Sequence, residues 1–75
     1  MKIFVDPGHG GGDAGATFGS LREKDVTLGV GLALCESLER KNHITSISRA
    51  SDYKVPLHVR ARLANQSESD LFISL

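Results

Sequence analysis

The sequence lacks the features that mark several large classes of protein. It has 75 residues with no tryptophan and only one cysteine, so no intrachain disulfide can form. Aromatic residues make up 5% of the chain, too few for stacking platforms that bind nucleic-acid bases. Nine basic and nine acidic residues cancel, so no polybasic surface for nucleic acid or membranes is expected. No apolar run approaches the ~20 residues that span a bilayer, so no membrane span is expected.

The length allows one domain at most, and a domain of this size buries only about 60% of its unfolded surface. A hydrophobic content of 40% is nevertheless sufficient for a globular core. The chain enters a strand directly at Met1, so we expect no signal peptide in it. Cys35 lies among helical apolar residues and is expected to be a buried, inert thiol.

The order of the predicted elements favours an α/β fold. The elements are a strand over 2–6, a loop over 7–22, a helix from about 24 with its cap at Asn42, a strand over 44–48, a helix from Pro56 to about 67 and a strand over 71–75. This alternation predicts a mostly parallel sheet with right-handed crossovers, flanked by helices.

The first helix carries an apolar face that we expect to pack on the sheet. Its members are Val26, Val30, Ala33, Leu34 and Leu38, widened by Leu28, Leu32 and Cys35. Gly29 and Gly31 each weaken a helix by about 0.8–1 kcal/mol relative to alanine. The expected compensation is close approach of the helix to a neighbouring backbone.

A glycine-rich loop over 7–15 follows the first strand and carries His9. The carboxyl end of a strand in an α/β sheet is where such folds bind ligands. The nearby acids Asp6, Asp13 and Glu23 favour a metal site over a solvated turn. His9 and Glu23 lie at the same end of one strand-helix unit, so they can converge across the loop. Imidazole with carboxylate suits Zn²⁺ in a hydrolase.

The same loop offers a second interpretation. Residues 10–15 match the G-x-G-x-x-G pattern of dinucleotide-binding folds. That motif must open a helix directly, whereas here the helix is predicted to begin only near residue 24. A nucleotide-binding α/β domain is therefore an alternative that rests on a weak motif alone. The Walker phosphate loop is excluded, because no Gly-Lys-Ser/Thr follows the glycines.

Several stretches together resemble one known family. They are Ile3-Phe4-Val5-Asp6-Pro7-Gly8-His9-Gly10-Gly11, Leu21-Arg22-Glu23-Lys24-Asp25-Val26, Ser48-Arg49-Ala50-Ser51-Asp52, Leu57 with Arg60 and Ala64-Asn65, and Asp70-Leu71-Phe72-Ile73-Ser74. In order and spacing they resemble the zinc-dependent N-acetylmuramoyl-L-alanine amidases of the amidase-3 type, which are bacterial cell-wall hydrolases.

The resemblance implies that His9 and Glu23 are zinc ligands. In the family a third ligand, a histidine, follows the third strand directly, and the general-base glutamate lies much further along the chain. Both positions fall beyond Leu75, so we expect no catalytic residue in this chain. We therefore expect residues 1–75 to be the N-terminal portion of an amidase catalytic domain, truncated after the third strand. The complete domain is expected to be a larger three-layer α/β hydrolase.

The implied activity of the intact domain is hydrolysis of the amide between N-acetylmuramoyl and L-alanine in peptidoglycan. Zinc polarises the carbonyl in such chemistry, and a carboxylate acts as general base. The parent protein is expected in the cell envelope or outside the cell, and this chain alone is expected to be inactive. A non-catalytic cell-wall binding fragment is the other alternative.

Five further polar residues receive structural interpretations. Arg49, Asp52 and Arg60 match family positions and are expected to order the loop after the second strand through an ion pair. His43 and His58 are expected to have surface or capping roles rather than to bind metal.

Overall fold

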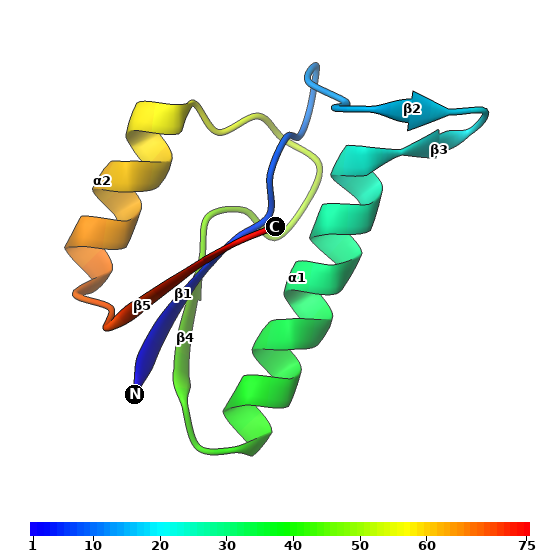
Figure 1. The fold of residues 1–75 in the computed structure, drawn as a ribbon. Helices are drawn as coiled ribbons and strands as arrows, with labels where there is room; N and C mark the ends of the chain where they lie inside the picture. Colours follow the sequence, from blue (N-terminus) through cyan, green and yellow to red (C-terminus); the bar gives the residue numbers. More distant parts are fainter.

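Three parallel strands form the centre of the fold, and β1 lies in the middle. The computed structural model describes residues 1–75, and its sheet has the order β4-β1-β5. The strands are β1 (Lys2–Asp6), β4 (Ile44–Ile47) and β5 (Leu71–Ser74). Helix α1 (Glu23–Arg40) lies on one side of this sheet and α2 (Leu57–Ser67) on the other (Figure 1). The predicted α/β fold with a parallel sheet flanked by helices is confirmed.

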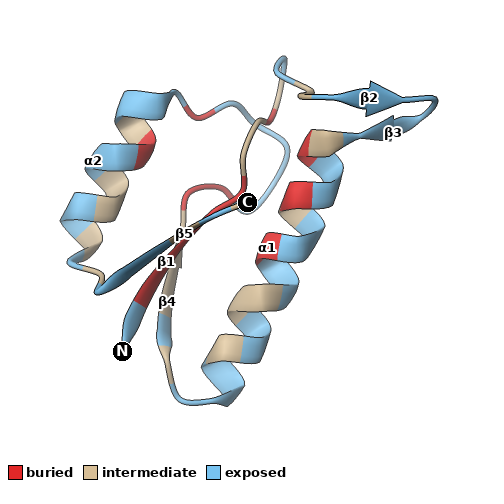
Figure 2. Ribbon diagram, viewed as in Figure 1, coloured by how far each residue is buried: buried red, intermediate tan, exposed pale blue.

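The apolar core is centred on β1. Ile3, Phe4 and Val5 are exposed by only 3%, 2% and 0%, because a central parallel strand is covered on both faces. Phe4 stacks on Phe72 of the neighbouring β5 with ring centroids 5.4 Å apart. Figure 2 shows that burial is concentrated on β1, on the segments that follow β1 and β4, and on the first half of α1. The core therefore lies next to the carboxyl end of the sheet.

The predicted apolar face of α1 is partly wrong. Leu28, Leu34, Cys35 and Leu38 are half-buried as expected. The stripe Val26, Val30, Leu32 and Ala33 is exposed, and Val30 is 50% accessible. The buried residues of the helix are instead Lys24, Thr27 and Gly31. Because the first turns of α1 face loop carbonyls rather than the apolar sheet, polar side chains occupy that part of the buried face.

The predicted boundaries differ from the structure by one residue at several places. The C-cap of α1 is Lys41, and Asn42 follows it with a φ of 67°, so the predicted cap lies one residue too late. Pro56 is the N-cap of α2 rather than part of the helix. Strand β1 has the predicted bounds, whereas β4 and β5 each end one residue earlier.

The long loop before α1 contains a hairpin that the sequence patterns did not indicate. Its strands β2 (Thr17–Phe18) and β3 (Leu21–Arg22) pair antiparallel and project beyond the sheet (Figure 1). Both strands are exposed, so no alternation of apolar and polar residues marks them.

Neither helix of the fold has the length and apolarity required of a bilayer-spanning segment.

The two glycines of α1 differ in their surroundings. A Cβ on Gly31 would lie 2.7 Å from Cγ of Pro7, whereas one on Gly29 would meet nothing within 4 Å. The expected close approach is thus confirmed for Gly31, although against a proline ring rather than backbone, and is wrong for Gly29.

These surroundings give opposite expectations for two matched substitutions. Gly29→Ala should raise the free energy of unfolding by about 0.8–1 kcal/mol through helix propensity alone. Gly31→Ala should lower it, because overpacking a tight contact typically costs about 1–3 kcal/mol. Urea unfolding of both variants measures the difference. Equal stabilisation by the two alanines would contradict the packing of α1 against Pro7.

Candidate metal centre

His9 is held in an unusual backbone conformation just beyond the end of β1. Its φ is 65°, in the left-handed region that only a few per cent of non-glycine residues occupy. The guanidinium of Arg60 donates to the His9 carbonyl oxygen at 2.8 Å. The turn that follows is closed by two backbone hydrogen bonds between Gly10 and Asp13, of 2.7 and 3.0 Å. This turn brings the Asp13 side chain back to the imidazole.

Two carboxylates contact opposite nitrogens of the His9 ring. Nδ1 lies 3.0 Å from Oδ2 of Asp13, and Nε2 lies 3.0 Å from Oε2 of Glu23. The second oxygen of each carboxylate accepts a backbone N–H, from Gly15 for Asp13 and from Ala16 for Glu23. Both carboxylates are therefore oriented by the loop.

Gly15 allows this close arrangement. It has a φ of 69°, and a Cβ at this position would lie 2.7 Å from His9 Cδ2 and 2.9 Å from Glu23 Oε1. Any side chain here would separate the imidazole from Glu23. The glycine is thus part of the site, and only its place in a glycine-rich loop indicated this in the sequence.

The carboxylates alter the acid-base properties of the cluster. The hydrogen bond with Asp13 raises the pKa of the His9 imidazole above its ordinary value, and the charge of Glu23 adds to this effect. The hydrogen bond with His9 lowers the pKa of Asp13. The hydrogen bond from the Ala16 amide lowers the pKa of Glu23, with His9 contributing further. Both carboxylates are therefore ionised at neutral pH.

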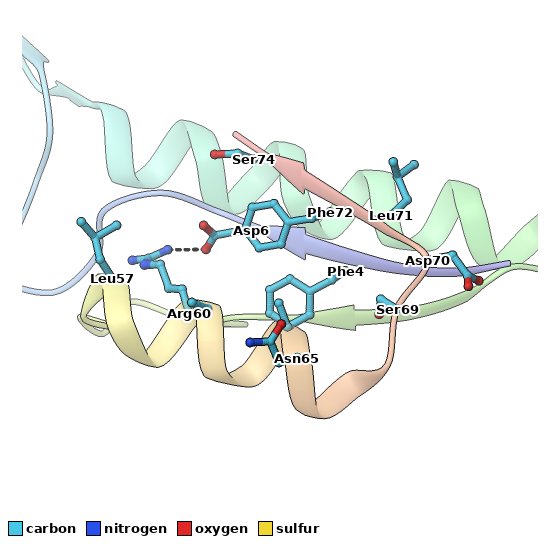
Figure 3. A pocket seen from close by; sticks show the side chains of 12 residues that line it. Phe4, Asp6, Leu57, Arg60, Asn65, Ser69, Asp70, Leu71, Phe72 and Ser74 are labelled. Atoms are coloured by element: carbon cyan, nitrogen blue, oxygen red, sulfur yellow. Dashed lines mark hydrogen bonds and ion pairs between the residues drawn. The ribbon is translucent and has the colours of Figure 1, made fainter.

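Two buried arginines fix the loop that carries His9. Arg49 is 1% exposed and donates to four carbonyl oxygens. These belong to Pro7, Gly8, Lys24 and Ser51. Arg60 pairs with Asp6 at 2.6 Å and donates to carbonyl oxygens of Pro7, His9 and Val55. Figure 3 shows the Arg60 side chain reaching from α2 to Asp6 at the end of β1.

A third ion pair ties the glycine loop to the segment after β4. Lys24 Nζ donates to Asp52 at 2.9 Å and to the Gly11 carbonyl at 3.0 Å. The Asp52 carboxylate in turn accepts the Gly11 N–H at 2.8 Å. Asp52 thus orders the segment after β4 through an ion pair, as expected, with Lys24 as its partner. Arg60 forms an ion pair with Asp6, whereas Arg49 binds carbonyl oxygens and forms no ion pair. No role was assigned to Lys24, although it lies in the family-like stretch 21–26 and shares a helix face with Thr27 and Gly31.

The structure unites some of the predicted site residues and separates others. His9 and Glu23 meet as predicted, and Asp13 joins them. Asp6 is buried with Arg60 and Ser48 and makes no contact with His9. Asp13 and Glu23 lie on opposite sides of the ring, and no three potential ligands converge in this chain. His9 Nε2 and Glu23 are thus the pair of donors that could hold a metal.

The other histidines and the glycine motif lie outside this arrangement. His43 Nδ1 lies 3.1 Å from the amino terminus, and His58 is exposed at the start of α2. Residues 10–15 are followed by the β2–β3 hairpin and not by a helix. The dinucleotide motif therefore lacks the helix N-terminus that binds a pyrophosphate.

Comparison with known proteins places these residues in context. The sequence model of the family described as N-acetylmuramoyl-L-alanine amidase matches residues 3–75. A sporulation-specific N-acetylmuramoyl-L-alanine amidase of Bacillus subtilis is 46% identical over 77 residues, which cover 100% of this chain and 30% of that protein.

Solved structures agree with the sequence match. The N-acetylmuramoyl-L-alanine amidase AmiC2 of Nostoc punctiforme superimposes with a TM-score of 0.93 at 36% identity, over 99% of this chain and 42% of that one. Cwp6 from Clostridium difficile superimposes with a TM-score of 0.94 at 39% identity, over 97% of this chain and 12% of that one. The chain spans 30% of the length of the first two curated relatives that it matches and as little as 15% of others.

The Lys24–Asp52 pair predicts a specific pH dependence of stability. The hydrogen bond from Lys24 lowers the pKa of Asp52 below its ordinary 3.8. A carboxyl whose pKa is lower in the folded state than in the unfolded state stabilises the fold at pH values above its unfolded-state pKa. This stabilisation is lost as the pH falls through the folded-state pKa. Asp52→Asn should therefore lower the melting temperature at neutral pH and flatten its decline below about pH 4.

Thermal melts from pH 2 to 7 measure this effect. The exposed Asp25, which makes no side-chain hydrogen bond, provides the matched control in Asp25→Asn. An acid decline that is equally steep in wild type and Asp52→Asn would contradict the assigned role of the pair.

Proposed function

The chain belongs to the N-acetylmuramoyl-L-alanine amidase family, and on this premise we propose that it carries part of a peptidoglycan-cleaving zinc site. The reaction is hydrolysis of the amide between the lactyl group of N-acetylmuramic acid and L-alanine. The single observation that supports this most directly is the pair of donors formed by His9 Nε2 and Glu23 Oε2, 3.0 Å apart. We place the parent protein in the cell envelope or outside the cell, where this substrate is found.

The donor set fits zinc. Imidazole nitrogen and carboxylate oxygen are both common zinc ligands, and His2Glu is a known catalytic set. Glu23 begins α1 directly after β3, and its second oxygen is held by the Ala16 amide, so the carboxylate is oriented before any ion arrives. Residues 1–75 would thus supply two of the three protein ligands that a catalytic zinc usually takes, and the family resemblance implies a histidine as the third ligand and a glutamate as the general base.

His9 and Glu23 would hold the zinc, which would supply the Lewis acid for polarising the scissile carbonyl. The chain's own residues do the positioning. Arg60 holds the His9 carbonyl and Arg49 holds those of Pro7 and Gly8, so the imidazole is presented at the end of β1. Such preorganisation avoids the cost of ordering the loop when substrate arrives.

The ligand assignment is tested by metal binding to the purified chain. We expect wild type to bind zinc and both His9→Ala and Glu23→Ala to lose stoichiometric binding, because each removes one of two donors. Equilibrium dialysis followed by elemental analysis measures the bound zinc. His58→Ala, which removes an exposed histidine outside the site, should leave it unchanged. If both His9→Ala and Glu23→Ala bound as much zinc per chain as wild type, the assignment of these residues as ligands would be wrong.

The activity is tested in a chimera. Residues 1–75 replace the matching part of the Nostoc punctiforme AmiC2 catalytic chain, which contributes the remaining residues. We expect the chimera to release peptides from purified peptidoglycan with new amino groups on L-alanine and no new reducing ends. His9→Ala in the chimera should abolish release, and the 75-residue chain alone should be inactive.

The alternative function predicts a different result. If residues 1–75 were a non-catalytic cell-wall binding fragment, the chain would sediment with peptidoglycan. The chimera that contains it would then fold and bind zinc but would not cleave peptidoglycan. New reducing ends would indicate glycosidase chemistry instead. Circular dichroism of each chimera checks that inactivity does not result from misfolding.

A further inference from the structure

We propose that Lys54 is a specificity-determining residue that pairs with a free carboxylate of the peptidoglycan stem peptide. The carboxylate belongs to the second residue of the stem, just beyond the amide that is cleaved. This inference rests on the proposed function for the identity of the substrate. The unpaired cation and the hollow that it lines are properties of the chain itself.

Lys54 lines the same hollow as His9. This hollow has a volume of about 610 Å³ and lies at the carboxyl end of the sheet, between the glycine loop and the start of α2. We call it the His9 hollow, and its lining includes Asp6, His9, Asp13, Lys54, Leu57 and Ser74. Its volume is in the range of small-molecule sites, which is roughly 300–1,000 Å³. A ligand that contacts His9 from this side can therefore also contact Lys54.

The ammonium of Lys54 has no partner within the chain. Of the other charged side chains in the hollow, Asp6 forms an ion pair with Arg60. The Asp13 carboxylate contacts the His9 imidazole. Lys54 itself forms no ion pair and no side-chain hydrogen bond. Its positive charge and three donors are therefore available to an anionic ligand.

The charge of Lys54 acts on one side of the His9 ring. The hydrogen bond with His9 is the largest cause of the lowered pKa of Asp13, and the charge of Lys54 adds to it. Asp13 contacts Nδ1 of the imidazole, whereas Glu23 contacts Nε2. A substrate whose scissile amide lies at the His9–Glu23 pair would therefore extend past the imidazole to reach Lys54.

The backbone on both sides of Lys54 is anchored. Its amide nitrogen would lie 2.8 Å from a Cβ on Gly11, so this segment packs directly on the glycine loop. Asp52, two residues earlier, accepts the Gly11 N–H at 2.8 Å. Val55, the next residue, is 7% exposed, and its carbonyl accepts from Arg60 at 2.8 Å. Only the lysine side chain has to be ordered when an anion binds, which limits the entropic cost.

The chemistry of the substrate identifies the anion. On the glycan side of the scissile bond the lactyl carboxyl is part of the amide and the sugars are N-acetylated, so that side carries no charge. On the peptide side, L-alanine is followed by a D-glutamate linked through its γ-carboxyl, which leaves the α-carboxylate free. In an extended chain this carboxylate lies about 6–7 Å from the scissile carbonyl carbon. Conversion to the α-carboxamide removes the charge and keeps the shape.

The experiment compares two forms of N-acetylmuramoyl-L-alanyl-D-glutamate γ-methylamide, one with the α-carboxylate and one with the α-carboxamide. Binding of each to the 75-residue chain is measured by ¹H–¹⁵N chemical-shift titration. Wild type should bind the carboxylate about two- to fivefold more tightly, as expected of an exposed ion pair. The preference should disappear near 1 M salt, where the Debye length is about 3 Å.

Three variants assign the preference to one side chain. Lys54→Met should bind the two compounds equally, whereas Lys54→Arg should keep the preference because it keeps the charge. Lys41→Met removes an exposed lysine at the far end of α1 and should behave as wild type does. In the AmiC2 chimera, kcat/KM for the two compounds should show the same preference and the same loss in Lys54→Met.

Equal binding of both compounds by wild type, or binding of neither, would overturn the inference. A preference that survives in Lys54→Met, or that is lost in Lys41→Met, would also overturn it. A chimera that cleaves neither these compounds nor peptidoglycan would refute the proposed function. The binding preference of the chain would still decide the role of Lys54 in that case.

Discussion

The structure depends on the burial of two guanidinium groups against the carbonyl oxygens at the end of β1. Arg49 and Arg60 both donate to the carbonyl of Pro7, and between them they bind those of Gly8 and His9. These carbonyls leave the sheet ladder where the loop begins, and the arginines supply the hydrogen bonds that the ladder no longer gives them, with Thr27 as a further donor to Gly8. Removing one member of a buried ion pair such as Arg60–Asp6 typically costs about 3–5 kcal/mol.

In many proteins an apolar core stabilises the fold and separate polar residues form the site, but here polar residues do both. The buried apolar residues number four, Ile3, Phe4, Val5 and Val55, against six that are polar or charged. Every buried side-chain nitrogen and oxygen has a hydrogen-bond partner, so the polar interior is fully satisfied. The residues that hold the fold together at this end are therefore the same ones that hold His9 in place.

Sequence patterns predicted the main elements and placed His9 and Glu23 at the same end of one strand-helix unit, because periodicity and the topology of such a unit are local properties. The family resemblance then assigned the two residues as metal ligands. The patterns did not predict which face of α1 is buried. Lys24 and Thr27 are buried because they bind carbonyl oxygens of the preceding loop, and the apolar periodicity of the helix carries no information about those carbonyls. The β2–β3 hairpin carried no alternation, as both strands are exposed. The resemblance marked Arg49, Asp52 and Arg60, but their partners come from distant segments and required the structure. The contact of Asp13 with His9 depends on a left-handed φ that composition alone does not specify.

The hydrogen bond from Arg60 to the His9 carbonyl joins residues 51 positions apart in the chain. The native conformation of the His9 loop therefore requires α2 to be docked on the sheet beside β1. Local opening of α2 would release the same loop, so amides of the two segments should share one opening free energy in hydrogen exchange. The conformation in which His9 is presented thus depends on a helix that contributes no ligand.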